Sequence, residues 1–104
     1  MVRETRAYRC HAISEDIGSI TLDTVLVEDP GPGEVQINVK ACSVNFPDLL
    51  MIQGKYQFKP PLPFAPGGEA SGDVVVVGSE VSGVEVGDRV VFGSRHGCFA
   101  ETLN

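Results

Sequence analysis

Alternating hydrophobic and polar positions give the clearest structural signal along this chain. Residues 35–41 alternate without a break, which is the pattern of a half-buried antiparallel strand. A Pro- and Gly-rich segment at 29–33 precedes this strand and predicts a tight turn. Before the turn, shorter patterns predict strands at 8–13 and 20–27.

The second half of the chain also reads as short strands. The β-branched run within 72–78 is bounded by Gly at each end and predicts a strand buried on both faces. Further strands are expected at 89–92 and, last, within 98–103. The Gly-rich stretch at 67–72 is interpreted as a turn that lets the backbone pass close to a neighbouring strand.

One helix is predicted at 46–53. Pro47 and Asp48 stand in its first turn and Gly54 follows its end, the usual asymmetry of helix termini. Residues 55–66 carry four prolines and are expected to form an ordered loop. Together these elements predict a mainly β fold, a closed or partly closed β-barrel with one or two short helices.

Composition narrows the class of protein. The 104 residues suit one domain, and 42% hydrophobic residues with 21% charged residues argue against disorder. A net charge of −6 disfavours nucleic acid as a partner. The longest apolar runs are far shorter than the ~20 residues of a membrane span. No secretory signal is expected, because residues 1–6 are not followed by an apolar segment. Three cysteines, an odd number, predict reduced thiols and a cytoplasmic location.

Neither a phosphate-binding loop nor a metal site is encoded with convincing spacing. The sequence lacks both the G-x-G-x-x-G and the Walker A patterns, so it holds no complete nucleotide site. The soft metal ligands include no C-x-x-C pair, and nothing indicates an activated Cys–His nucleophile. Cys10 and Cys42 are interpreted as small buried residues. The ligands considered are Cys10, His11, Cys42, His96 and Cys98.

Three polar residues stand in an otherwise apolar or Pro-rich stretch: Asn45, Asp48 and Tyr56. A purely structural interpretation is that Asn45 or Asp48 caps the helix. In the same interpretation Tyr56 is partly buried, with its hydroxyl on a backbone carbonyl. Residue types alone leave this interpretation and a functional one open.

Ordered motifs occur at residues 30–35, 44–48, 54–56, 66–72 and 87–90, with Gly78 and Val81 between the last two. Together they resemble the amino-terminal half of medium-chain dehydrogenases/reductases. Within that superfamily the chain most resembles the zinc-independent NAD(P)H:quinone oxidoreductases, relatives of zeta-crystallin. The resemblance implies a GroES-like fold, in agreement with the strand pattern.

Departures from the zinc-dependent alcohol dehydrogenases carry chemical meaning. Those enzymes have a zinc-binding Cys where this chain has Asn45, and a His where it has Gly68. The resemblance therefore implies a zinc-free site, since an amide and a bare backbone do not replace a thiolate and an imidazole. Without a Lewis acid, hydride transfer to a conjugated acceptor is favoured over reduction of a plain ketone.

The resemblance also implies roles for individual residues. Asn45 is expected at the nicotinamide and substrate end of a cleft, whose wall Asp48 orients. Tyr56 is expected to line the quinone pocket and is the candidate catalytic hydrogen-bond donor. Gly68 and Glu69 are expected beside the same cleft.

Further expectations concern the whole enzyme. NADPH is expected to be bound mainly by a Rossmann domain that family members carry after this region and that lies outside residues 1–104. The parent is expected to be a homodimer that reduces a small quinone or enone, and residues 1–104 alone are expected to be inactive. Many quinone reductases carry Tyr where this chain has Leu50, which leaves the proton donor and the substrate open.

Two alternatives stay open. An enoyl-thioester or enone reductase shares the same scaffold and hydride chemistry. A stand-alone GroES-like binding or co-chaperone module is the alternative from a different class, because fold alone does not fix function.

Overall fold

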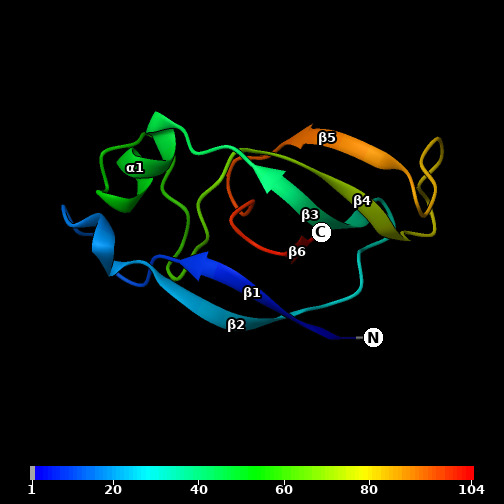
Figure 1. The fold of residues 1–104 in the computed structure, drawn as a ribbon, viewed down its shortest axis with the longest axis horizontal. Helices are drawn as coiled ribbons and strands as arrows, with labels where there is room; N and C mark the ends of the chain where they lie inside the picture. Colours follow the sequence, from blue (N-terminus) through cyan, green and yellow to red (C-terminus); the bar gives the residue numbers. More distant parts are fainter. Residues whose placement is uncertain (1) are drawn as a thin grey trace.

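The computed structural model describes residues 2–104 as two antiparallel β-sheets with one short α-helix at one end (Figure 1). The first sheet pairs β1 with β2, and the second has the strand order β5-β4-β3-β6. The mainly β fold is therefore confirmed. The elements are β1 (Arg3–Arg9), η1 (Ile17–Ser19), β2 (Thr21–Val27), β3 (Val35–Cys42), α1 (Phe46–Ile52), β4 (Glu69–Val77), β5 (Arg89–Gly93) and β6 (Thr102–Leu103).

The first strand lies earlier than the sequence predicts. β1 ends at Arg9, whereas the pattern places a strand at 8–13. The buried face of β1 is made by Thr5 and Ala7, which are small or polar and give little hydrophobic signal. After Arg9 the backbone leaves β2, and Cys10 forms an isolated bridge with Phe64 instead.

Strand β4 is longer and less buried than predicted. It begins at Glu69, three residues before the Gly that bounds the predicted strand. Val74 is fully buried, but the three valines after it are only half-buried, so the prediction of burial on both faces is wrong. Burial alternates along the first part of β4, where Ala70, Gly72 and Val74 are buried and the residues between them are not, so one face of the strand remains partly open to solvent. The last strand is also shorter than expected, because only Thr102–Leu103 pair with β3.

Glycines allow the close backbone approaches predicted for residues 67–72, but the prediction of a turn is wrong from Glu69 on, where β4 has already begun. A Cβ atom on Gly72 would lie only 2.2 Å from the carbonyl oxygen of Asn38 on the adjacent strand. Gly67 has φ of +108°, and a Cβ atom there would lie 2.8 Å from the backbone nitrogen of Phe99. At both positions a side chain would displace a neighbouring segment of the same chain, so glycine is required.

A few backbone contacts join the two sheets. Tyr8 donates its N–H to the Phe99 carbonyl at 2.9 Å, and Glu101 donates to the Arg6 carbonyl at 2.9 Å. Across residues 2–104 no continuous ladder links the sheets, so of the two forms predicted the barrel is the partly closed one.

Helix α1 covers one end of the molecule and supplies part of the core. Met51 and Ile52 pack with Cys10 and Phe64 in the buried cluster. The helix begins one residue before Pro47 and ends before Gly54, whose φ is +71°. The prediction of a short helix here is thus confirmed.

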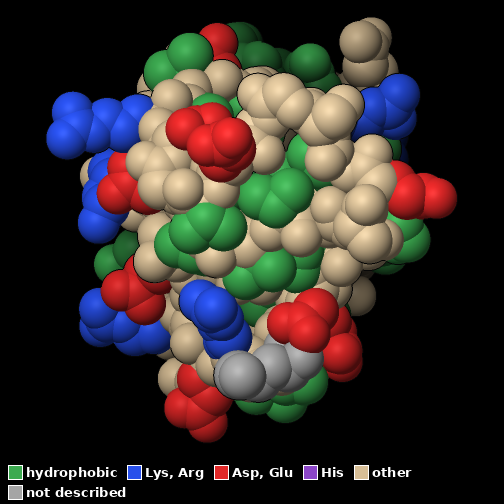
Figure 2. All heavy atoms as spheres, turned by 90° about the vertical axis from the view of Figure 1, so that its right-hand side faces the viewer, with side chains coloured by type: hydrophobic (Ala, Val, Ile, Leu, Met, Phe, Trp, Pro, Cys, Tyr) green, Lys and Arg blue, Asp and Glu red, His purple; other side chains and the backbone are tan. Residues whose placement is uncertain are grey.

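The end of the molecule opposite α1 shows acidic and basic side chains interspersed among hydrophobic ones (Figure 2). No helix within residues 2–104 is long and apolar enough to cross a membrane.

Candidate functional site

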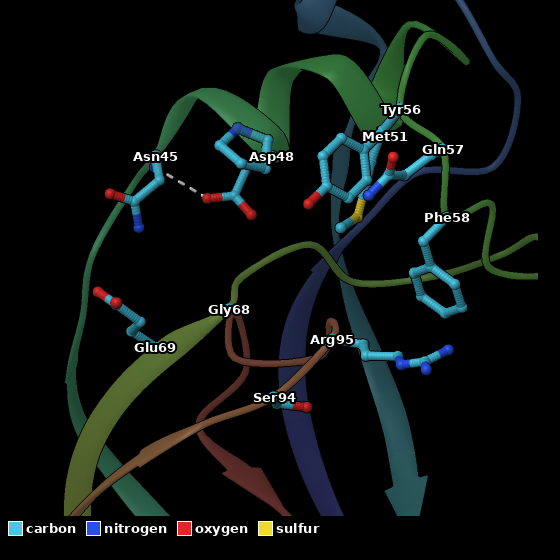
Figure 3. Close-up of a pocket in the computed structure, with 11 residues that line it drawn as sticks. Asn45, Asp48, Met51, Tyr56, Gln57, Phe58, Gly68, Glu69, Ser94 and Arg95 are labelled. Carbon is cyan, nitrogen blue, oxygen red and sulfur yellow. Dashed lines mark hydrogen bonds between the residues drawn. The ribbon is translucent and has the colours of Figure 1, made fainter.

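A cleft of about 830 Å³ opens between α1, the loop after it, the start of β4 and the loop after β5 (Figure 3). Its volume lies within the range of small-molecule sites. All five residues singled out in the sequence line this cleft, although they come from separate segments. The lining residues are Asn45, Pro47, Asp48, Met51, Tyr56, Gln57, Phe58, Gly68, Glu69, Ser94 and Arg95.

Asp48 fixes the wall of the cleft. Its side chain is buried, with 4% of the residue exposed. One carboxylate oxygen accepts the Asn45 N–H at 2.9 Å, and the other accepts the Gly67 N–H at 2.9 Å. The helix-capping interpretation of Asp48 is confirmed. The same carboxylate also ties the start of α1 to the loop that leads into β4.

A chain of side-chain hydrogen bonds crosses the acidic end of the cleft. The Asn45 amide donates to the Ser43 hydroxyl oxygen at 2.9 Å, and that hydroxyl donates to the Glu69 carboxylate at 3.0 Å. Ser43 was missed in the sequence. Its spacing of two from Asn45 is a usable signal, because such residues share a face in extended backbone.

Tyr56 is half-buried and directs its hydroxyl into the cleft (Figure 3). No hydrogen bond joins this hydroxyl to any residue of the described chain, so the expected bond to a backbone carbonyl is not found. The hydroxyl is therefore available to a bound molecule.

The opposite end of the cleft is aromatic and cationic. The guanidinium carbon of Arg95 lies 5.0 Å from the centroid of the Phe58 ring. His96 packs against the same ring at 5.7 Å and against Phe64 at 6.4 Å. Ser94 donates its hydroxyl to the His96 carbonyl at 2.7 Å. No local pattern points to Arg95, since only the fold brings the loop after β5 beside α1.

The soft metal ligands do not converge. Among residues 2–104 no three His, Cys, Asp or Glu side chains form a group that could hold a metal ion. Burial raises the pKa of the Cys98 thiol to about 11, and the neighbouring Cys42 and Asp48 add to the effect. Burial also raises the pKa of Cys10. Cys42 is exposed, so its interpretation as a small buried residue is wrong.

The profile of the alcohol dehydrogenase GroES-like domain matches residues 31–103. The chain belongs to this family. Among its relatives, quinone oxidoreductase-like protein 2 from Mus musculus is 45% identical over 96 residues. That match covers 92% of this chain and 27% of the mouse protein.

Solved structures of GroES-like domains agree with the fold described above. The human synaptic vesicle membrane protein VAT-1 homolog-like protein has a TM-score of 0.90 at 36% identity, over 96% of this chain and 32% of that one. The quinone oxidoreductase from Coxiella burnetii has a TM-score of 0.89 at 26% identity, over 97% of this chain and 34% of that one. These matches confirm the resemblance to quinone oxidoreductases of the medium-chain superfamily. The chain spans only about a third of these relatives' length, or less.

Proposed function

We propose that this domain forms the substrate side of a zinc-free reductase that transfers hydride from NADPH to a quinone or similar conjugated carbonyl. The observation that carries the proposal is the cleft in which the Tyr56 hydroxyl has no hydrogen-bond partner in the described chain and shares the lining with Asn45 and Gly68. The family and its quinone oxidoreductase relatives support the same chemistry.

The donor set of the cleft supports a site without zinc. The Asn45 amide nitrogen bonds to Ser43, and both carboxylate oxygens of Asp48 accept backbone N–H groups. Gly68 has no side chain to offer. A catalytic zinc takes three N, S or O ligands from the protein. In this cleft Asn45 is neutral, Gly68 has no side chain, and the Asp48 carboxylate is already engaged by backbone N–H groups, so three free zinc ligands are not present among these residues.

The same residues suit NADPH and an acceptor side by side. When bound, NADPH supplies the hydride. Asn45 and the bare backbone at Gly68 would hold the nicotinamide end of the cofactor, and the open volume of the cleft supports this part of the proposal. Tyr56 is proposed to hydrogen-bond the acceptor oxygen, where charge develops as hydride adds to the conjugated system, and to hold the proton that this oxygen takes. For a quinone, one hydride and one proton give the quinol.

Further parts of the proposal concern the whole protein. We propose that NADPH is held mainly by a Rossmann domain outside residues 1–104, as the family resemblance implies. We also propose that the whole enzyme is a homodimer and that it is located in the cytoplasm. The domain alone is expected to show no turnover, because hydride transfer requires a positioned cofactor.

Tyr56→Phe in the full-length protein tests the proposal. We expect quinone-dependent NADPH oxidation in the unaltered protein and a kcat lowered by about 10²–10⁴ in the variant, the usual contribution of a positioned proton donor. Tyr8→Phe is the matched control, because Tyr8 is the other tyrosine and lies outside the cleft. Equal rates in the two variants would remove Tyr56 from the reaction.

The choice of acceptor separates the alternatives. Turnover of crotonyl thioester without turnover of benzoquinone would favour the enoyl-thioester reductase. No turnover of either, together with a ring-shaped oligomer, would favour the stand-alone GroES-like module. Metal analysis of the active protein provides the test of the zinc-free site, since bound zinc that activity requires would contradict it.

A further inference from the structure

The two ends of the cleft differ in charge. Asn45 and Glu69 lie at one side, and Phe58 and Arg95 lie at the opposite side, with the Tyr56 hydroxyl between them (Figure 3). Of the described residues that line the cleft, Arg95 alone is cationic. A bound molecule therefore meets acidic side chains at one end and a guanidinium at the other.

Arg95 has no protein counter-charge in the described chain. Within residues 2–104 its guanidinium makes no ion pair and no hydrogen bond, although the sequence holds fourteen Asp and Glu residues against eight Lys and Arg residues. Arg6, Arg9 and Lys55, by contrast, each pair with a carboxylate. An unpaired guanidinium at the rim of a cleft keeps its five N–H donors for a ligand.

The Phe58 ring holds this guanidinium at the rim. A separation of 5.0 Å from the ring centroid is within cation–π range. This contact uses no N–H donor in a hydrogen bond to the protein, so the guanidinium can bind a carboxylate or a sulfonate through two parallel hydrogen bonds. His96 also packs against the Phe58 ring, with 5.7 Å between the ring centroids.

We propose that Arg95 and Phe58 form an anchoring subsite for the anionic group of an aromatic substrate. This assignment rests on the proposed function and names its substrate class: conjugated carbonyl compounds that carry a carboxylate or sulfonate away from the reacting carbonyl. Glu69 and Asp48 disfavour the anionic group at the other end, so the molecule is oriented with its carbonyl toward Tyr56. Arg95 is a specificity-determining residue in this arrangement and takes no part in proton or hydride transfer.

Kinetics with paired acceptors test the subsite. The full-length protein and Arg95→Gln are compared with naphthoquinone and with naphthoquinone sulfonate. We expect Arg95→Gln to raise KM for the sulfonate about tenfold, the size of one charge-assisted contact, and to change KM for naphthoquinone less than about twofold. Arg89→Gln is the matched control, since Arg89 is exposed on β5 and does not line the cleft.

Two kinetic outcomes would overturn the proposal. One is an equal rise of KM for both quinones. The other is a rise of KM for NADPH with both quinones unaffected, which would assign Arg95 to the cofactor.

A binding measurement keeps this test separate from that of the proposed function. Naphthalene carboxylate is titrated calorimetrically into the full-length protein and into Arg95→Gln, at low and at high salt. We expect about tenfold weaker binding to the variant, and a salt dependence that the variant loses. If no quinone is reduced but this difference is seen, the proposed function fails and the anionic subsite stands. Equal binding to both proteins would overturn the subsite.

Discussion

Two aspartates of this domain show how the same carboxylate does different work in different surroundings. Asp48 is buried in the wall of the cleft and accepts two backbone N–H groups. Asp23 lies on the first sheet, where its partners are the side chains of Thr21, Arg9 and His11. Backbone donors are fixed by the fold, whereas side-chain donors rotate toward water when the carboxylate is lost. Asp48 therefore holds structure in place, and Asp23 mainly makes stability depend on pH.

Of the changes considered, removal of the Asp48 carboxylate should lower the stability of the domain most. Asp48→Ala leaves the N–H groups of Gly67 and Asn45 without their acceptor, one of them in a buried position. We expect a loss of about 2–6 kcal/mol in the free energy of unfolding, because each of the two unsatisfied donors costs roughly 1–3 kcal/mol. Urea denaturation measures the loss. Asp23→Ala serves as the reference, and an equal effect of the two substitutions would contradict the contrast.

Gly72 gives a second test of the rigid part of the molecule. Gly72→Ala forces a Cβ atom against the Asn38 carbonyl, so β3 and β4 must separate locally. We expect a loss of about 1–3 kcal/mol, as for other overpacked sites. Gly33→Ala is the matched control, because a Cβ atom there meets nothing within 4 Å. Thermal unfolding that shifts alike in both variants would show that the strands adjust freely.

The smallest expected effect is the pH dependence that Asp23 confers. Hydrogen bonds from Thr21, then Arg9 and His11, lower the pKa of Asp23 to about 2. Because the unfolded chain has an ordinary Asp pKa of about 3.9, this stabilisation is present above about pH 4 and is lost as the pH falls toward 2. Asp23→Asn should flatten the stability curve over that interval. An NMR titration in which Thr21→Val leaves the pKa of Asp23 unchanged would contradict the assigned cause.

The elements that could be predicted from the sequence are those with strong local signals. The alternation at 35–41 predicts β3, and Pro47 with Gly54 predicts both ends of α1, because each signal arises within a few residues. The position of β1 was not predictable in this way. Its buried residues are Thr5 and Ala7. They face inward because β1 pairs with β2 and because Ala7 forms a bridge with Ala100, and no local sequence pattern encodes these long-range contacts.

The candidate site was predictable to a similar degree. Asn45, Asp48 and Tyr56 stand within a dozen residues and are polar in apolar surroundings. The local pattern singles them out, the family resemblance assigns them to a cleft, and all three line one cleft. Arg95 lies far along the chain in an unremarkable loop. Its proximity to Phe58 depends on how β5 pairs with β4, which is a property of the sheet and not of the neighbouring sequence.

The unequal burial of the three cysteines has a practical consequence. Cys10 and Cys98 are buried, while Cys42 is exposed at the end of β3, shortly before the cleft residue Asn45. A maleimide fluorophore should therefore label residues 2–104 at one position without any engineered substitution. Placed there, the dye would act as an optical sensor for molecules that enter the neighbouring cleft.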